Sequence, residues 1–245
     1  MTTFSLHRGA RWIGIACTAT TLLHAAVSPA SALAAGPRVA LDAGHSPAQP
    51  GARSAGGAPE HRFNTTLRAR VADDLRAAGA SVAYTAGDDE EIALQARSSR
   101  VPDADLFVSL HHDSMQQAYI DAGRQREFHG FAIFVSARNP DYQQSLRCAK
   151  AIGARLRAAG QQPSLYHAEP IRGENRPIID GTLGIHRFDD LVVLRTARMP
   201  ALLIEAGVIA NPDEEARLQQ PATVARVAGA ISAGVLDCSR TASRL

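Results

Sequence analysis

Short apolar runs recur along the chain and predict buried β-strands. Each run is bounded by polar, Gly or Pro residues, and runs of this length are typical of strands inside a sheet. We expect strands at residues 39–42, 81–85, 106–110, 131–136, 191–194 and 201–205.

Between these runs, apolar residues follow the spacing of one helix face. Phe63, Leu67, Val71 and Leu75 recur every four residues, and Gly79 ends the pattern. Two further stripes predict helices: Tyr142, Leu146, Ala149, Ile152 and Leu156, ended by Gly160, and Val224, Val227, Ile231 and Val235.

The alternation of strands and helices predicts an α/β fold. We expect a single domain in residues 36–245, with a mostly parallel, twisted sheet covered by helices on both faces. Residues 112–129 and 161–190 fit no regular element. Loops of this length in a compact domain are usually functional or mobile, so 161–190 is a candidate lid or regulatory segment, with a passive surface insertion as the alternative.

The first 35 residues have the features of a secretory signal peptide. They contain no Asp or Glu, carry Arg8 and Arg11, run apolar from residue 12 to about 27, and end in small residues. An uncleaved membrane anchor is one alternative. A lipoprotein is another, although Gly14 stands where Leu usually precedes a lipid-modified Cys such as Cys17. We therefore expect a secreted or periplasmic protein without stable membrane insertion after cleavage.

Cleavage would remove two basic residues and leave 24 basic and 24 acidic residues. A formal charge of zero argues against a nucleic-acid partner. Two cysteines, Cys148 and Cys238, would remain. A disulfide and two buried free thiols are both compatible with the sequence.

Four residues with metal-binding or acid–base chemistry lie close to predicted element ends. His45 and His111 follow strands, Glu205 ends a strand, and Glu60 precedes the first helix. Open α/β sheets bind ligands at the carboxyl ends of their strands. Two His and one Glu match the three protein ligands of a catalytic zinc site, and Glu205 would then serve as the general base.

Simpler interpretations exist for each of these residues. A single His after a strand is often a hydrogen-bonded loop residue, and a Glu before a helix is a common partner of the helix dipole. His112 is as good a ligand by composition as its neighbour His111.

Four ordered sequence blocks resemble the zinc-dependent N-acetylmuramoyl-L-alanine amidase family. Residues 39–45 resemble the family's opening strand and D-x-G-H turn, with Ala43 where Pro is usual, and Glu60 follows at the spacing of the carboxylate ligand. Residues 105–111 resemble the D-L-F-I-S-I-H strand, and 193–207 resemble the V-L-R and M-P-A-V-L-V-E-x-G blocks. Residues 211–215 resemble the N-P-x-E-E motif that follows.

The resemblance implies Zn²⁺ held by His45, Glu60 and His111, with Glu205 as the catalytic residue. It implies hydrolysis of the amide between N-acetylmuramic acid and L-alanine in peptidoglycan. Arg195 would contact the substrate or form a structural ion pair. We further expect a monomer that a protein activator could regulate.

Two other functions are compatible with the same residues. One is a secreted zinc peptidase or deacylase acting on a different amide. The other is a non-catalytic wall-binding module, which the presence of Glu205 disfavours. The residues His112 and Asp113 stand where the family more often has Ala and Asn, so hydrogen bonding around the metal is expected to differ here.

Overall fold

The structure is a computed structural model that describes residues 1–5 and 36–242. The described residues from 36 onward form one compact unit. The predicted signal peptide and its cleavage site fall largely outside the described residues. Among the described helices, none combines the length and apolarity needed to cross a membrane.

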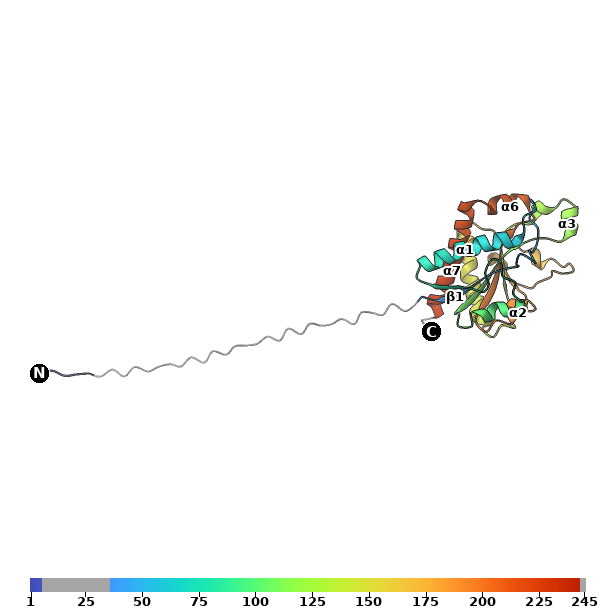
Figure 1. Cartoon of the computed structure of the whole chain (residues 1–245). Coiled ribbons are helices and arrows are strands. Elements are labelled where there is room, and N and C mark those ends of the chain that lie inside the picture. The colour runs from blue at the N-terminus through green and yellow to red at the C-terminus, as the bar shows by residue number, and fades with distance from the viewer. Residues whose placement is uncertain (6–35, 243–245) are drawn as a thin grey trace. The chain divides into compact units, whose positions relative to one another are not determined.

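Seven strands and seven α-helices alternate along the described chain, with the long helices on one side of the sheet (Figure 1). The strands are β1 Arg38–Ala43, β2 Ser81–Tyr84, β3 Leu106–Asp113, β4 Ala132–Val135, β5 Ile178–Asp180, β6 Ile185–Arg187 and β7 Ala201–Val208. The α-helices are α1 Glu60–Ala77, α2 Leu94–Arg97, α3 Gln117–Asp121, α4 Tyr142–Ala158, α5 Val192–Arg195, α6 Pro212–Leu218 and α7 Pro221–Ala242. Short 3₁₀ turns include η1 Ser98–Arg100, η2 Gln125–Glu127, η3 Tyr166–Ala168 and η4 Gly181–Leu183.

All seven strands form one sheet in the order β2-β1-β3-β7-β4-β6-β5. Strands β2, β1, β3 and β7 are parallel neighbours, while β4 is antiparallel to β7 and β5 is antiparallel to β6. The predicted α/β class, the mostly parallel sheet and the three long helices are confirmed. The carboxyl ends of β1, β3 and β7 therefore meet at one edge.

Two parts of the sequence-based assignment are wrong. The run 191–194 is not a strand, because Val192–Arg195 forms the one-turn helix α5, with Val193 and Leu194 buried. A four-residue apolar run cannot distinguish a buried strand from a buried helical turn. The segments 112–129 and 161–190 are not wholly irregular either. The first contains the end of β3, the five-residue helix α3 and the turn η2, and the second contains β5 and β6; elements this short have too few residues to show a period.

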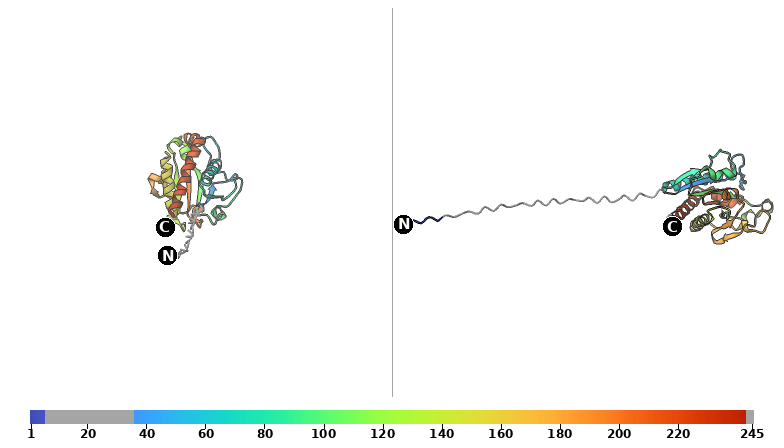
Figure 2. Two further views of the ribbon diagram at one scale, coloured as in Figure 1. Left: turned by 90° about the vertical axis from the view of Figure 1, so that its left-hand side faces the viewer. Right: turned by 90° about the horizontal axis from the view of Figure 1, so that it is seen from below.

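The two faces of the sheet are covered unequally. Helices α1, α4 and α7 pack on one face and form the larger apolar core, which includes Leu41, Val108 and Ile204. Short helices α2 and α5 lie on the other face, over a smaller core that includes Phe107 and Leu203 (Figure 1, Figure 2). Successive side chains along a strand point to opposite faces of the sheet, so the position of a polar residue in its strand decides which of these two faces it lies on.

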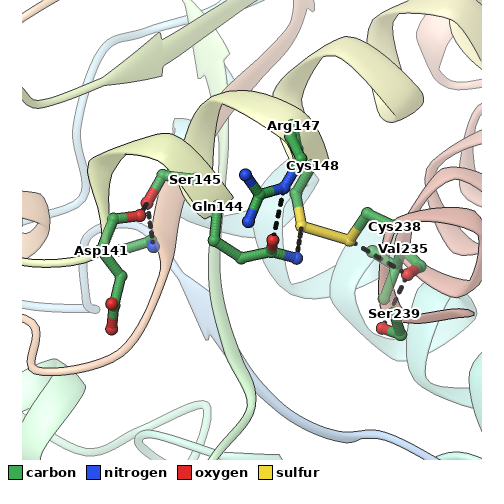
Figure 3. The surroundings of a disulfide bond; sticks show 9 residues. Asp141, Gln144, Ser145, Arg147, Cys148, Val235, Cys238 and Ser239 are labelled. Carbon is green, nitrogen blue, oxygen red and sulfur yellow. Dashed lines mark hydrogen bonds between the residues drawn. A yellow bond between two sulfur atoms is a disulfide. The ribbon is translucent and has the colours of Figure 1, made fainter. Parts of the chain in front are cut away.

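A disulfide joins two of the long helices. Cys148 of α4 and Cys238 of α7 are bonded, with Cα atoms 5.0 Å apart and both side chains buried (Figure 3). The bond closes a separation of 90 residues across the larger core. Of the two possibilities left open by the sequence, the structure therefore has the disulfide.

The disulfide should contribute measurably to stability, because it restricts the unfolded chain over a long loop. We expect the double substitution Cys148→Ala and Cys238→Ala to lower the free energy of unfolding by about 2–4 kcal/mol. Urea unfolding of the 36–245 chain with and without dithiothreitol measures this. The double variant should be insensitive to the reductant, and an identical midpoint for oxidised and reduced parent protein would contradict the expectation.

Candidate metal centre

The turn after β1 places the first histidine. His45 has a positive φ of 69°, a left-handed conformation that His tolerates better than most non-glycine residues. A Cβ atom at Gly44 would lie 2.1 Å from the ring of His111, and one at Gly51 would lie 2.5 Å from a Glu60 oxygen. Only glycine at these two positions leaves room for the three side chains to meet.

A buried ion pair stabilises this turn. Asp42 accepts hydrogen bonds from Thr85 at 2.5 Å, from Ser109 at 2.7 Å and from Arg97 at 2.9 Å. The same Arg97 guanidinium donates to the backbone carbonyl of His45 at 2.8 Å. Arg97 and Asp42 have side-chain exposures of 4% and 1%, so each buried charge depends on the other, and the pair fixes the backbone that carries His45.

The alternation of β3 separates the two neighbouring histidines. His111 points to the same face as Asp42 and Ser109, where its ring lies 5.1 Å from that of His45. His112 points to the opposite face, against Phe63 of α1, and its Nδ1 lies 2.8 Å from Asn64 Oδ1. Burial lowers the pKa of His112 to about 4, so this ring is neutral.

Glu60, the first residue of α1, lies between the two ligand candidates. Its Oε2 is 2.9 Å from His45 Nε2, and its Oε1 is 3.0 Å from His111 Nδ1. Asn64, one turn along the helix, donates to Glu60 Oε1 at 3.1 Å. Burial raises the pKa of Glu60, but hydrogen bonds from His111 and His45 outweigh it and hold the pKa well below its usual range.

These three side chains form a group that could hold a metal ion. The ligand atoms of His45, Glu60 and His111 all lie within 4.8 Å of one another. Two imidazole nitrogens and one carboxylate oxygen are the donors of many catalytic zinc sites. Asn64 and the backbone N–H of His112, which donates to Glu60 Oε1 at 3.3 Å, supply the outer hydrogen bonds that orient such ligands.

Glu205 lies next to this group on the neighbouring strand. It pairs in register with His111, so the two side chains point to the same face. Its buried Oε2 has no hydrogen-bond partner among the described residues. Burial, followed by the charges of Asp113 and Glu60, raises the pKa of Glu205 well above its usual value. A cation held by the adjacent three residues would lower that pKa again, which fits a metal at this place.

Arg195 lies on α5, not on the strands that carry His111 and Glu205. It is the last residue of α5, its side chain is exposed, and it forms no ion pair with a described residue. Its alternative role as a structural ion pair is therefore not seen. A pocket beside the histidines is lined by Gly44, His45, His111 and Val193 of the same helix α5.

Sequence reasoning did not find a second group of ionisable residues at this edge. His167, from the segment 161–190, lies 2.9 Å from both Asp113 Oδ2 and Glu174 Oε2. These residues are separated by up to 61 positions in the chain, and no local spacing joins them. The contact between Asn64 and Glu60, by contrast, could have been predicted from the sequence, because the two residues have the i, i+4 spacing of neighbours on a helix face.

Comparison with known proteins places this geometry in a family. A family model described as N-acetylmuramoyl-L-alanine amidase matches residues 39–237. The N-acetylmuramoyl-L-alanine amidase AmiC of Neisseria meningitidis is 26% identical over 223 residues, which are 81% of this chain and 52% of that protein. The chain thus spans about half the length of the curated relative it matches.

Two solved structures share the fold over their nearly complete length. The amidase Ami1 of Mycobacterium smegmatis has a TM-score of 0.69 at 24% identity, covering 84% of this chain and 98% of that one. Ami1 of Mycobacterium abscessus, solved without ligand, has a TM-score of 0.69 at 25% identity, with coverages of 84% and 99%. With the family model matched across the whole sheet and the His-Glu-His group, the chain belongs to the N-acetylmuramoyl-L-alanine amidase family.

Proposed function

We propose that the chain is a zinc-dependent hydrolase of the amide bond between N-acetylmuramic acid and L-alanine in peptidoglycan, acting in cell-wall remodelling or daughter-cell separation. One observation carries the proposal. His45, Glu60 and His111 converge within 4.8 Å, and Glu205 stands beside His111 on the next strand. A family member that only bound the wall would not need this arrangement.

The donor set supports zinc as the metal. Two imidazoles and one carboxylate leave a fourth position of a tetrahedral site for water or substrate. Zinc bound there would supply Lewis acidity, polarising the substrate carbonyl and lowering the pKa of water toward about 7. His45, Glu60 and His111 would hold the ion, and Asn64 orients Glu60.

Glu205 supplies the proton transfers in this proposal. As a carboxylate it accepts a proton from the attacking water, and it then donates that proton to the L-alanine nitrogen as the amide bond breaks. Its buried Oε2 makes no hydrogen bond with a described residue, so this oxygen is available to the reacting groups. The exposed Arg195 lies on α5, the helix that lines the adjacent pocket, and we assign it to contact with the substrate.

The proposed site of action is the cell envelope. We propose that residues 1–35 are a signal peptide and that 36–245 work as a secreted or periplasmic monomer. The disulfide between Cys148 and Cys238 supports an oxidising compartment. We retain the segment 161–190 as a regulatory element, on which a protein activator would act.

The products of peptidoglycan digestion test the reaction. We expect purified sacculi treated with the zinc-loaded chain to release L-alanine amino termini without new reducing sugar ends. Labelling of amino termini and a reducing-sugar assay measure the two products. Internal peptide cuts without free L-alanine termini would instead indicate a zinc peptidase.

The metal ligands can be tested with matched histidine variants. His111→Asn should lose at least tenfold in zinc affinity, because it removes a ligand nitrogen. His112→Asn should keep stoichiometric zinc, because an Asn amide can still donate to Asn64 Oδ1 on the opposite face of the sheet. Zinc content after dialysis measures both. Loss of zinc in the His112 variant with retention in the His111 variant would reverse the assignment.

The role of Glu205 predicts a separation of binding from turnover. Glu205→Gln should keep zinc while lowering kcat by about 10²–10⁴, the usual contribution of a general acid–base group. Turnover of a soluble muramoyl peptide and zinc content together measure this. A Gln variant with the parent's kcat would remove Glu205 from the reaction.

A further inference from the structure

His167 connects the segment 161–190 to the sheet at the edge that holds the site. It lies in the 3₁₀ turn η3, and its side chain is 11% exposed. Its Nε2 is 2.9 Å from Asp113 Oδ2 on β3, and its Nδ1 is 2.9 Å from Glu174 Oε2 further along the segment. One ring thus bridges a strand residue and a loop residue.

The bridge is ionic. The side chains of Asp113 and Glu174 are 11% and 15% exposed, and two carboxylates this buried need a cation between them. Burial lowers the pKa of His167, but the two carboxylates outweigh it and raise the pKa to about 10. Nδ1 of the protonated ring then donates to Glu174 Oε2, while Nε2 faces Asp113 Oδ2 at ion-pair distance without hydrogen-bond geometry.

The neighbours of His167 fix the plane of its ring. The ring centroid of Phe134, on β4, lies 4.8 Å away, and that of His186, on β6, lies 5.9 Å away. Phe134 pairs with Leu203 of β7. Glu205 lies two residues after Leu203 on the same strand, so Phe134 and Glu205 point to the same face of the sheet. Burial lowers the pKa of His186, whose Nε2 lies 3.2 Å from the carbonyl oxygen of Ser164, and the positive charge stays on His167.

The chain from His167 to Arg176 forms a closed loop, which we call the clamp loop. The backbone N–H of Arg176 donates to the carbonyl of His167 at 2.6 Å and closes its base. The guanidinium of Arg176 stacks on Phe188 at 3.7 Å. At the tip, the carbonyl of Arg172 accepts from the side chain of Gln116. His167 is therefore the point at which this loop meets β3.

We propose that His167 is a positioning residue for the reaction, which holds the clamp loop against β3 as a fixed wall beside Glu205 by joining Asp113 to Glu174. This inference rests on the proposed function, because it assigns the wall to the same active site. Removing the cation would leave Asp113 and Glu174 as like charges facing each other near Glu205. The clamp loop would then move away, and the reacting groups would lose their fixed geometry.

Three variants of the 36–245 chain test this: His167→Gln, Glu174→Gln and the double variant. Asp180→Asn is the matched control, because it removes a carboxylate from the same segment at the turn after β5, away from the site. Each is assayed for zinc content, for kcat and KM on a soluble muramoyl peptide, and for tryptic cleavage after the exposed Arg172.

We expect His167→Gln to keep zinc, to lower kcat at least tenfold with KM changed less than threefold, and to raise the rate of cleavage after Arg172 at least tenfold. Glu174→Gln should keep kcat within threefold of the parent, because the amide oxygen of Gln can still accept from His167 Nδ1. In the double variant, removal of the opposing charge of Glu174 should restore kcat to within threefold of the Glu174→Gln variant. Asp180→Asn should match the parent in all assays. A structural role without the ionic bridge would give no such rescue.

Two results would overturn the inference: parent-like kcat and cleavage in His167→Gln, or a double variant as impaired as His167→Gln alone. Should His167→Gln fail to fold, the double variant still decides, because the ionic model requires it to fold and to retain kcat. Should the parent itself not cleave muramoyl peptides, the proposed function fails, while the tryptic cleavage rates still report on the clamp loop.

Discussion

The pairing of His111 with Glu205 depends on the register of β3 against β7. A shift of one residue would turn one of these side chains to the opposite face of the sheet, where His112 already packs against α1. The register is set by the apolar neighbours on both strands, because Val108 and Ile204 must face the larger core. The same hydrophobic packing that stabilises the sheet therefore places the reacting groups side by side.

This arrangement concentrates negative charge at one edge of the sheet. The charges of Asp113, Glu60 and Glu174 all raise the pKa of Glu205, and the four carboxyl groups are largely buried. Buried carboxylates need cations, and the edge offers two places for them. The His-Glu-His group could hold a metal on one side, and His167 provides an imidazolium on the other. Glu205 pairs with the ligand candidate His111 and also feels the charge of His167.

The sequence predicted the parts of the fold and site that follow local rules. The long helices with a regular apolar stripe were identified correctly, and so were the strands that carry His111 and Glu205 and the strand that precedes His45. Two strand ends were placed too early, because β3 continues past His111 to Asp113 and β7 continues past Glu205 to Val208. The run at 191–194 was misassigned because four apolar residues carry no period, and β5 and β6 were missed for the same reason. His167 was missed because its partners come from distant segments. The choice between His111 and His112 needed the family resemblance, although strand alternation gives its physical reason.

Different parts of the structure stabilise the fold and surround the site. Three long helices and a disulfide stabilise the face that carries no reacting group. Beyond the carboxyl ends of β3 and β7, the segments 112–129 and 161–190 pack on each other through a small apolar cluster that includes Met115, Phe128 and Tyr166. Tyr119 of the first segment also donates to Glu169 of the second at 2.6 Å. These contacts involve none of the three ligand candidates, so their residues can change in sequence without disturbing the metal group. The ionic bridge at His167 is where such changes would reach Glu205.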